Sequence, residues 1–117
     1  MSTINYNGRI FRSMTNSAEG EVDARTTFRY RQQGNIVWAE YAGGKITLGQ
    51  LIGVVLPEGQ LEVRYQHVNE DDELMTGICI STPEILPDGR IRLHESWQWT
   101  CGERQSGESV VEEILVL

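Results

Sequence analysis

Turn signals cut this chain at short intervals, and no helical periodicity lies between them. Residues 56–60 (Leu-Pro-Glu-Gly-Gln) and 86–90 (Leu-Pro-Asp-Gly-Arg) are near copies of each other. In each, the proline fixes φ for a type I turn and the glycine supplies the left-handed position of a three-residue hairpin loop. The stretches between turns alternate polar and apolar residues and are rich in Val, Ile, Thr, Tyr and Trp. This pattern predicts a β meander.

We expect eight sequential strands. Their predicted ranges are 4–14, 21–32, 35–42, 45–56, 60–68, 74–86, 90–101 and 108–116. Short links between so many strands favour closure, because an open sheet would leave two edges free to pair. A chain of 117 residues is also too short for two ordinary domains. The expected fold is all-β, with one domain over residues 1–117 forming an eight-stranded antiparallel up-and-down meander closed into a small barrel.

The turns also predict which side chains share a face. We expect a three-residue loop that ends at Gly34 and a two-residue loop at Gly43 and Gly44. Opposed residues of a hairpin point to the same face, so counting outward from each turn assigns one interior face. This interpretation requires Trp38 and Trp99 to lie on the same side of the sheet. The predicted interior residues are Thr26, Phe28, Tyr30, Ile36, Trp38, Glu40, Thr47, Gly49, Leu51, Gly53, Leu61, Val63, Tyr65, His67, Met75, Gly77, Cys79, Ser81, Ile91, Leu93, Glu95, Trp97 and Trp99.

The predicted interior contains two carboxylates, Glu40 and Glu95, among large apolar side chains. Glu95 stands out because it lies between Leu93 and Trp97 at strand spacing, where an ionised carboxylate is costly unless it is paired. It is a ligand anchor, a general acid or base with a raised pKa, or a member of a structural hydrogen-bond network. No catalytic residue can be assigned. The candidate ligand-binding residues are Glu95, Glu40, His67, Tyr65, Tyr30, Trp38, Trp97, Trp99 and Ser81.

Charge and cysteine content limit the partners of the chain. Ten basic and seventeen acidic residues give a formal net charge of −7, which repels nucleic acid and anionic membranes. The longest apolar stretch, 51–56, is too short to span a bilayer, and we expect a cytoplasmic protein. The predicted register places Cys101 ~13 Å from Cys79, so both should be free thiols. Two cysteines cannot form a four-cysteine zinc site, and we expect no metal and no cofactor.

Several segments resemble a known group of proteins. They include 7–9 (Asn-Gly-Arg), 27–30 (Thr-Phe-Arg-Tyr), 74–79 (Leu-Met-Thr-Gly-Ile-Cys) and 93–100 (Leu-His-Glu-Ser-Trp-Gln-Trp-Thr). Over nearly the whole chain, the sequence resembles a family of short uncharacterised bacterial proteins that are often labelled N-acetylglutamate synthase. That label implies acetyl transfer, for which acetyl-CoA is usually bound at a helix N-terminus. The sequence predicts no such helix, so the label is the disfavoured alternative.

Three functions remain open. The first is a small-molecule-binding barrel of unknown ligand, with aromatic walls and interior carboxylate anchors, similar to calycin-like barrels of the lipocalin-like or avidin-like kind. The second is a small barrel enzyme of lyase, isomerase or hydrolase type that uses Glu95 as acid or base. The third is a filled barrel that acts as an interaction or homodimer module. Its interface would be the outer face of strand 45–56, where we expect Ile46, Leu48, Ile52 and Val54.

Overall fold

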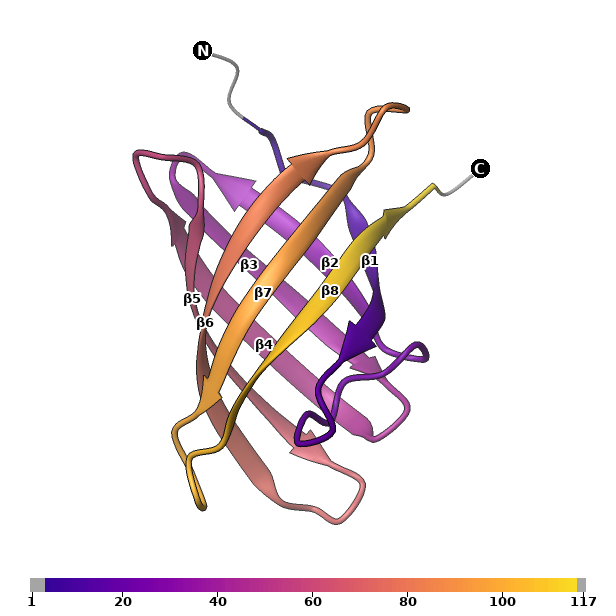
Figure 1. The fold of residues 1–117 in the computed structure, drawn as a ribbon, viewed down its shortest axis with the longest axis vertical. Helices are drawn as coiled ribbons and strands as arrows, with labels where there is room; N and C mark the ends of the chain where they lie inside the picture. The colour runs from indigo at the N-terminus through magenta and orange to yellow at the C-terminus, as the bar shows by residue number, and fades with distance from the viewer. Residues whose placement is uncertain (1–3, 116–117) are drawn as a thin grey trace.

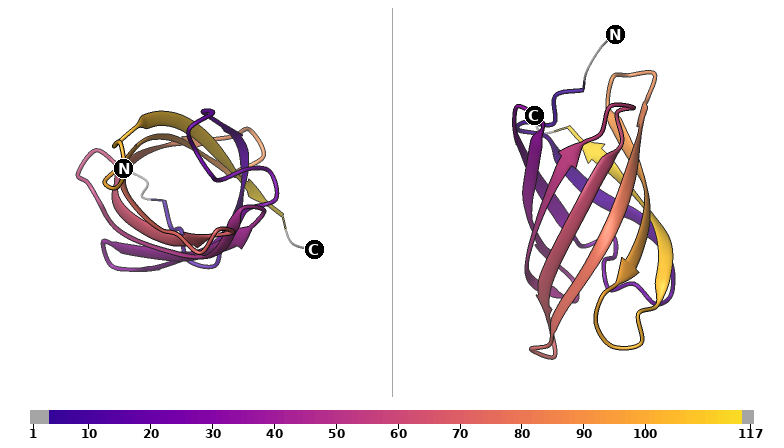
Figure 2. Two further views of the ribbon diagram at one scale, coloured as in Figure 1. Left: turned by 90° about the horizontal axis from the view of Figure 1, so that it is seen from below. Right: turned by 90° about the vertical axis from the view of Figure 1, so that its left-hand side faces the viewer.

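The computed structural model describes residues 4–115 and shows a closed antiparallel barrel (Figure 1). Each strand pairs with the next along the chain, and the last pairs with the first, so the strands form a ring when viewed from one end (Figure 2). The strands are β1 (Ile10–Asn16), β2 (Thr27–Gln33), β3 (Ile36–Gly43), β4 (Ile46–Val55), β5 (Leu61–Asn69), β6 (Leu74–Ile85), β7 (Ile91–Trp99) and β8 (Ser106–Ile114). The predicted all-β barrel is confirmed.

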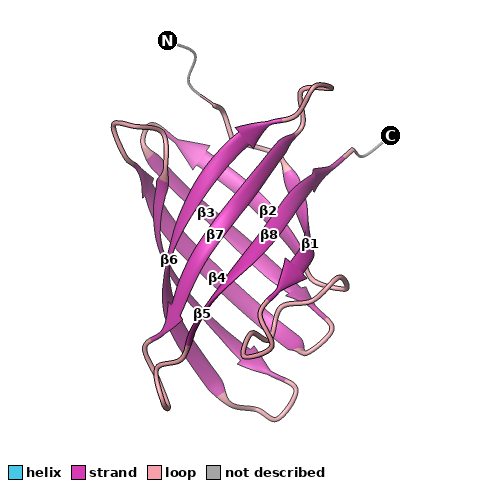
Figure 3. Ribbon diagram, viewed as in Figure 1, coloured by secondary structure: helices cyan, strands magenta, loops and turns pink. Residues whose placement is uncertain are grey.

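Strands and loops account for all of residues 4–115, and no helix occurs in that range (Figure 3). Consequently, the described part of the chain contains no helix long and apolar enough to cross a membrane. Cys79 and Cys101 are both free thiols, as the register predicted.

The first two strands are shorter than predicted. β1 begins at Ile10 and β2 begins at Thr27, whereas the sequence predicted strands from 4 and from 21. Asp23 explains part of the difference, because its carboxylate accepts a hydrogen bond from the Arg25 backbone N–H at 2.9 Å. Such an Asx turn competes with strand pairing. Residues 17–26 therefore form a loop at one end of the barrel, which we call the β1–β2 loop.

The β2–β3 turn overturns the predicted face of β3. Gln33 pairs with Ile36, so the loop has two residues, and Gly34 has a φ of 60°. Glycine with positive φ at the first loop position is typical of a type II′ turn. The expected three-residue loop at Gly34 was therefore wrong. A shift by an odd number of residues moves every side chain of a strand to the opposite face.

As a consequence, the interior of β3 is formed by Val37, Ala39 and Tyr41, which are buried. The predictions for the other three positions were wrong. Ile36 and Glu40 are exposed and Trp38 is half-buried on the outer face, opposite Ile52 of β4. Trp38 and Trp99 thus lie on opposite sides of the sheet.

A β-bulge returns β4 to its predicted face. The loop is formed by Gly44 and Lys45, because Gly43 pairs with Ile46. Relative to both neighbouring strands, β4 then carries one extra residue near Thr47, which is exposed rather than interior as predicted. The bulge also turns Ile46 into the core, at 3% exposure, so this residue does not belong to the outer face as expected.

From β4 onward the predicted register is confirmed. Leu51 lies opposite Tyr65, Gly77 opposite Trp99, and Ser81 opposite Glu95. The two proline-containing turns carry this agreement, since Gly59 and Gly89 have φ values of 94° and 90°, as the three-residue loops require. The predicted interior residues of β5, β6 and β7 therefore share one face.

The two ends of the barrel are filled differently. At the end that contains the β2–β3 turn, the interior is packed with fully buried apolar side chains, among them Phe11, Val37, Leu61, Ile91, Leu93 and Val111. Tyr6, at 1% exposure, lies beside Tyr30 with ring centroids 6.0 Å apart. The opposite end holds the aromatic and polar interior residues described next, beneath the β1–β2 loop.

Candidate functional site

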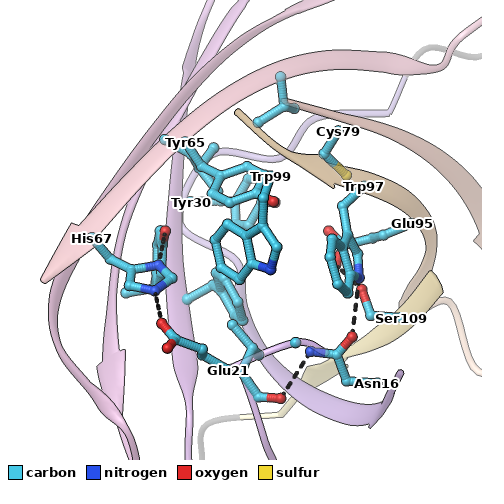
Figure 4. A pocket seen from close by; sticks show the side chains of 16 residues that line it. Asn16, Glu21, Tyr30, Tyr65, His67, Cys79, Glu95, Trp97, Trp99 and Ser109 are labelled. Atoms are coloured by element: carbon cyan, nitrogen blue, oxygen red, sulfur yellow. Dashed lines mark hydrogen bonds and ion pairs between the residues drawn. The ribbon is translucent and has the colours of Figure 1, made fainter. Parts of the chain in front are cut away.

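A cavity of about 60 Å³ lies inside the barrel at the end covered by the β1–β2 loop (Figure 4). Its wall is mostly apolar and aromatic, with a few polar groups at defined places. The lining residues are Asn16, Gly20, Glu21, Val22, Phe28, Tyr30, Tyr41, Leu51, Val63, Tyr65, His67, Cys79, Glu95, Trp97, Trp99 and Ser109. Each of the eight strands contributes at least one of these residues, and the acidic, histidine and serine side chains come from β5, β7, β8 and the β1–β2 loop.

Glu95 is the acidic group that the strands contribute to the cavity wall, whereas the second carboxylate, Glu21, comes from the β1–β2 loop. Register places it between Ser81 of β6 and Ser109 of β8. The Ser109 hydroxyl donates to one carboxylate oxygen at 2.9 Å and the Ser81 hydroxyl to the other at 3.4 Å. Burial raises the pKa of Glu95 to about 7, and the two hydroxyl donors oppose this rise without cancelling it. Glu95 is therefore poised to change its protonation state near neutral pH.

The other titratable groups near Glu95 stay neutral. Burial raises the pKa values of Tyr30, Tyr41, Tyr65 and Cys79, and the negative charge of Glu95 adds to each rise. None of the residues that line the cavity, all within 4–115, is a lysine or an arginine. An ionised Glu95 thus has hydroxyl donors but no positive charge on the cavity wall.

Aromatic rings form most of the remaining wall. Trp97 and Trp99 lie with ring centroids 5.5 Å apart, and Tyr65 meets Trp99 edge-on at 5.8 Å. Glycines make room for rings that lean across the sheet. A Cβ on Gly77 would collide with the Tyr65 ring, and one on Gly49 would collide with the Tyr41 ring. Tyr41 lies opposite Gly49.

A second polar cluster fixes the loop over the cavity. One carboxylate oxygen of Glu21 lies 2.8 Å from Nε2 of His67, and the other accepts a hydrogen bond from the Asn69 amide at 2.9 Å. Nδ1 of His67 lies 2.9 Å from the Tyr41 hydroxyl. These contacts are satisfied when Nε2–H donates to Glu21 and the hydroxyl donates to Nδ1. Burial lowers the pKa of His67 more strongly than Glu21 raises it, so the imidazole is neutral at pH 7.

Both indole N–H groups of the cavity donate hydrogen bonds to residues in or next to the β1–β2 loop. Trp97 donates to the side-chain oxygen of Asn16 at 3.0 Å, and Trp99 donates to the backbone carbonyl of Glu19 at 3.2 Å. Asn16 in turn donates to the carbonyl of Val22 at 3.0 Å. Because β5 lies four strands from β1 around the ring, contacts from Glu21 to β5 mean that the loop crosses the barrel mouth.

The structure brings together six of the predicted candidates. Glu95, His67, Tyr65, Tyr30, Trp97 and Trp99 all line the cavity. Ser81 contacts Glu95 from the neighbouring strand. The two remaining candidates do not belong to this site: Glu40 is exposed and Trp38 lies on the outer face, because the β2–β3 turn reverses β3.

Sequence reasoning missed four polar or aromatic residues of the site. Tyr41 was not predicted as an interior residue because β3 was assigned the wrong face. A type II′ turn at Gly34 would have placed Tyr41 in the interior. Ser109 follows from extending the register of β7, since it pairs with Glu95. Asn16 and Glu21 lie next to or within a loop, and no strand periodicity could have placed their side chains over the mouth.

The described residues hold no metal-binding constellation. Within 4–115, no group of three or more His, Cys, Asp or Glu side chains is arranged to bind an ion. The polar groups of the cavity act as hydrogen-bond partners, and Glu95 is in addition an acid that titrates near neutral pH.

Comparisons with known proteins identify the family. A search of the curated proteins found no match to the chain. Neither the N-acetylglutamate synthase label nor a bacterial origin gains support from the comparisons. The family model for avidin-like proteins matches residues 4–114, which include every strand of the barrel. The chain therefore belongs to the avidin-like protein family.

Proposed function

We propose that this protein is a small-molecule-binding barrel whose ligand occupies the cavity beneath the β1–β2 loop. The observation that carries the proposal is the cavity itself, which combines aromatic walls with an acidic side chain inside a closed barrel. Small-molecule sites in proteins are typically concave and apolar, with a few polar groups that orient the ligand. Eight-stranded barrels have room for interior side chains or for one small ligand.

The contrast between the two barrel ends supports a binding role over a filled core. The packed end excludes cavities with aliphatic side chains such as Leu61, Ile91 and Leu93. A barrel selected for stability alone would fill its other end in the same way, because interiors normally pack to crystal density. Instead, that end keeps Glu95 where burial penalises its charged form. A bound molecule would fill the space and contact the carboxyl group.

A ligand screen by thermal shift tests this proposal. We expect some compounds from a library of small, flat ring molecules to raise the melting temperature of the wild-type protein. Biotin belongs in this library, because streptavidin is another barrel that holds one small ligand. The shift should be lost in Glu95→Gln and kept in Glu40→Gln, a matched change on the outer face. A library without a single stabilising compound, or shifts that Glu95→Gln leaves unchanged, would overturn the proposal.

The second candidate is an enzyme that uses Glu95 as acid or base, and one observation favours it. The carboxyl group lines a cavity and has a pKa of about 7, which suits proton transfer near neutral pH. Incubating the binders from the screen with protein and following them by NMR tests this candidate. Conversion that stops in Glu95→Gln would support catalysis, whereas recovery of every binder unchanged between pH 6 and pH 8 would exclude it for those compounds.

A further inference from the structure

We propose that the ligand of this cavity is a small organic cation, with a planar amidinium or guanidinium group that pairs with Glu95 and lies against the tryptophan rings. This inference rests on the proposed binding function and names its ligand class. It follows from the charges, the hydrogen-bond donors and the ring surfaces of the cavity wall.

The ionised carboxylate of Glu95 has no cation to pair with on the cavity wall. Its carboxylate oxygens accept hydrogen bonds from Ser109 and Ser81, and both donors are neutral. No lysine or arginine is found among the residues that line the cavity within 4–115. A buried carboxylate is stable in its ionised form when a cation pairs with it. A ligand cation supplies the missing charge, and an anionic ligand would be repelled.

His67 does not supply that charge. Its Nε2 lies 2.8 Å from Glu21 and its Nδ1 lies 2.9 Å from the Tyr41 hydroxyl, so both ring nitrogens are engaged away from Glu95. Burial also keeps the ring neutral near pH 7, because it lowers the pKa of the imidazole. Glu21 likewise is held by His67 and Asn69, which leaves Glu95 as the carboxylate without a strong partner.

Aromatic rings line the same cavity as the carboxyl group of Glu95. Trp97, Trp99 and Tyr65 lie within one contact cluster, with centroid separations of 5.5 Å and 5.8 Å. Indole and phenol faces attract cations, and the attraction grows when the cation is desolvated. A planar amidinium can also donate two parallel hydrogen bonds to one carboxylate. A cavity with aromatic faces and a carboxylate that lacks a cationic partner therefore suits a planar cation better than it suits a neutral ring compound.

The cavity size restricts the cation to a compact molecule. A volume of about 60 Å³ holds a small group and not a long chain. Larger ligands would have to displace the β1–β2 loop, which is held through Glu21, Asn16 and the indole N–H groups. Acetamidinium and benzamidinium are suitable compounds for the test, since they present the same charged group at two sizes.

The proposal has a pH signature that a neutral ligand would lack. The negative charge of Glu95 acts on Tyr30 of β2, Tyr41 of β3, Tyr65 of β5 and Cys79 of β6, and all four stay neutral near pH 7 because their pKa values are raised. Among these groups, Glu95 is the one that titrates between pH 6 and pH 8. Because its pKa is about 7, an amidinium that binds the ionised form should bind about tenfold more weakly at pH 6 than at pH 8.

The experiment compares each amidinium with the amide of the same shape. Isothermal titration calorimetry of acetamidinium against acetamide, and of benzamidinium against benzamide, is run at pH 6 and pH 8 with wild type, Glu95→Gln and Glu40→Gln. We expect at least one amidinium to bind tenfold or more tightly than its amide, with the stated pH dependence. Glu95→Gln should remove the difference and Glu40→Gln should preserve it.

The possible results separate this inference from the proposed function. An amide that binds as tightly as its amidinium would overturn the cation inference and leave a binding function standing. If no amidinium binds, the cation inference is also overturned, and the broader library of the thermal-shift screen decides on binding. The wild-type pH dependence remains a test even if Glu95→Gln does not fold.

Discussion

Glu95 is the residue at which strand periodicity and burial disagree most. Alternation along β7 would place an apolar side chain between Leu93 and Trp97, and the chain has an acid there instead. The serine hydroxyls on either side hold the carboxyl group in place, yet burial still raises its pKa to about 7. A residue of this kind lowers stability at alkaline pH, which suggests that it is kept for binding or chemistry.

This disagreement predicts how stability depends on pH. In the unfolded chain Glu95 ionises near its ordinary pKa of about 4.5, whereas in the barrel it ionises near 7. The folded pKa is raised, so the contribution of this group to stability is full below pH 4.5 and is lost as pH rises through 7. Between pH 5 and pH 8 the loss should be about 2 to 3 kcal/mol. Glu95→Gln should remove it, as chemical denaturation at both pH values would show.

The sign of that effect is its strictest test. A wild-type protein that gains stability relative to Glu95→Gln from pH 5 to pH 8 would contradict the assignment of a raised pKa. Glu40→Gln is the matched control, because Glu40 is exposed on the outer face and should leave the pH profile unchanged.

Gly49 is a second residue that shapes the site, because the absence of a side chain there leaves room for the Tyr41 ring. The Tyr41 ring occupies the space that a Cβ on Gly49 would need. Gly49→Ala should push this ring aside, weaken its hydrogen bond to His67 and lower the free energy of unfolding by about 1 to 3 kcal/mol. Gln50→Ala, at the exposed neighbouring position of β4, should cost far less. Equal effects of the two changes on urea unfolding would contradict this packing argument.

At the scale of strands and turns, the sequence predicted the barrel well and the face of one strand wrongly. Proline and glycine at 57–59 and 87–89 determine a loop length, and the registers that depend on them were confirmed. The turn at Gly34 has no proline, and two loop lengths place its glycine at a left-handed position. The wrong loop length assigned the side chains of β3 to the wrong faces. The bulge near Thr47 adds one residue to β4 and so returns its side chains to the predicted faces.

Two successive register errors, each by an odd number of residues, explain why the predicted interior remained consistent. Each hairpin was counted from its own turn, so the reversed β3 matched its neighbours on both sides and gave no contradiction. Strand alternation in β3 could not decide between the faces, because Ile36 and Trp38 compete with Val37 and Tyr41 as interior side chains. The position of the β1–β2 loop could not be predicted from the sequence, because it depends on side-chain contacts between distant residues, such as Glu21 with His67.

The contacts of the β1–β2 loop predict its dynamics. A hydrogen bond to a charged group contributes about 1.5 to 3 kcal/mol, roughly twice a neutral one. Glu21→Gln should therefore speed amide hydrogen exchange about tenfold in residues 17–26, because less free energy holds the loop closed. Exchange in β5 and β7 should stay slow. Glu19→Gln is the control, because the Glu19 side chain is exposed and its backbone carbonyl makes the contact to Trp99.

An outcome in which both variants exchange alike would show that Glu21 does not hold the loop. Faster exchange across the whole barrel would instead show that Glu21 stabilises the fold rather than the loop alone.

At the scale of the whole molecule, closure hides the backbone edges and leaves the outer side chains as the contact surface. The outer faces of β3 and β4 carry an apolar patch formed by Ile36, Trp38, Leu48, Ile52 and Val54. Of these, Leu48 and Ile52 are 53% and 59% exposed. Apolar side chains gathered on one face favour association with another protein surface. The strand predicted as a homodimer interface keeps three of its four apolar residues on that face, since Ile46 turns inward.

This patch predicts self-association. Sedimentation velocity of the wild-type protein should show a dimer, and Ile52→Lys should shift the population toward monomer, because a charge at the centre of an apolar contact is costly to bury. Ile85→Lys is a matched control, since Ile85 is also 59% exposed but lies outside the patch. A wild-type protein that sediments as a monomer at every concentration would contradict the prediction, as would equal effects of the two lysines.

The division of the three tryptophans between the two sides of the sheet has a practical consequence. Trp97 and Trp99 line the cavity and donate their indole N–H groups to Asn16 and to the β1–β2 loop, whereas Trp38 lies on the outer patch. Indole fluorescence responds to local polarity, and in a Trp38→Phe protein both remaining tryptophans would line the cavity in which we propose that a ligand binds. Binding of a ligand could then be followed without a label, as a change in the tryptophan emission wavelength when solvent is displaced from the cavity.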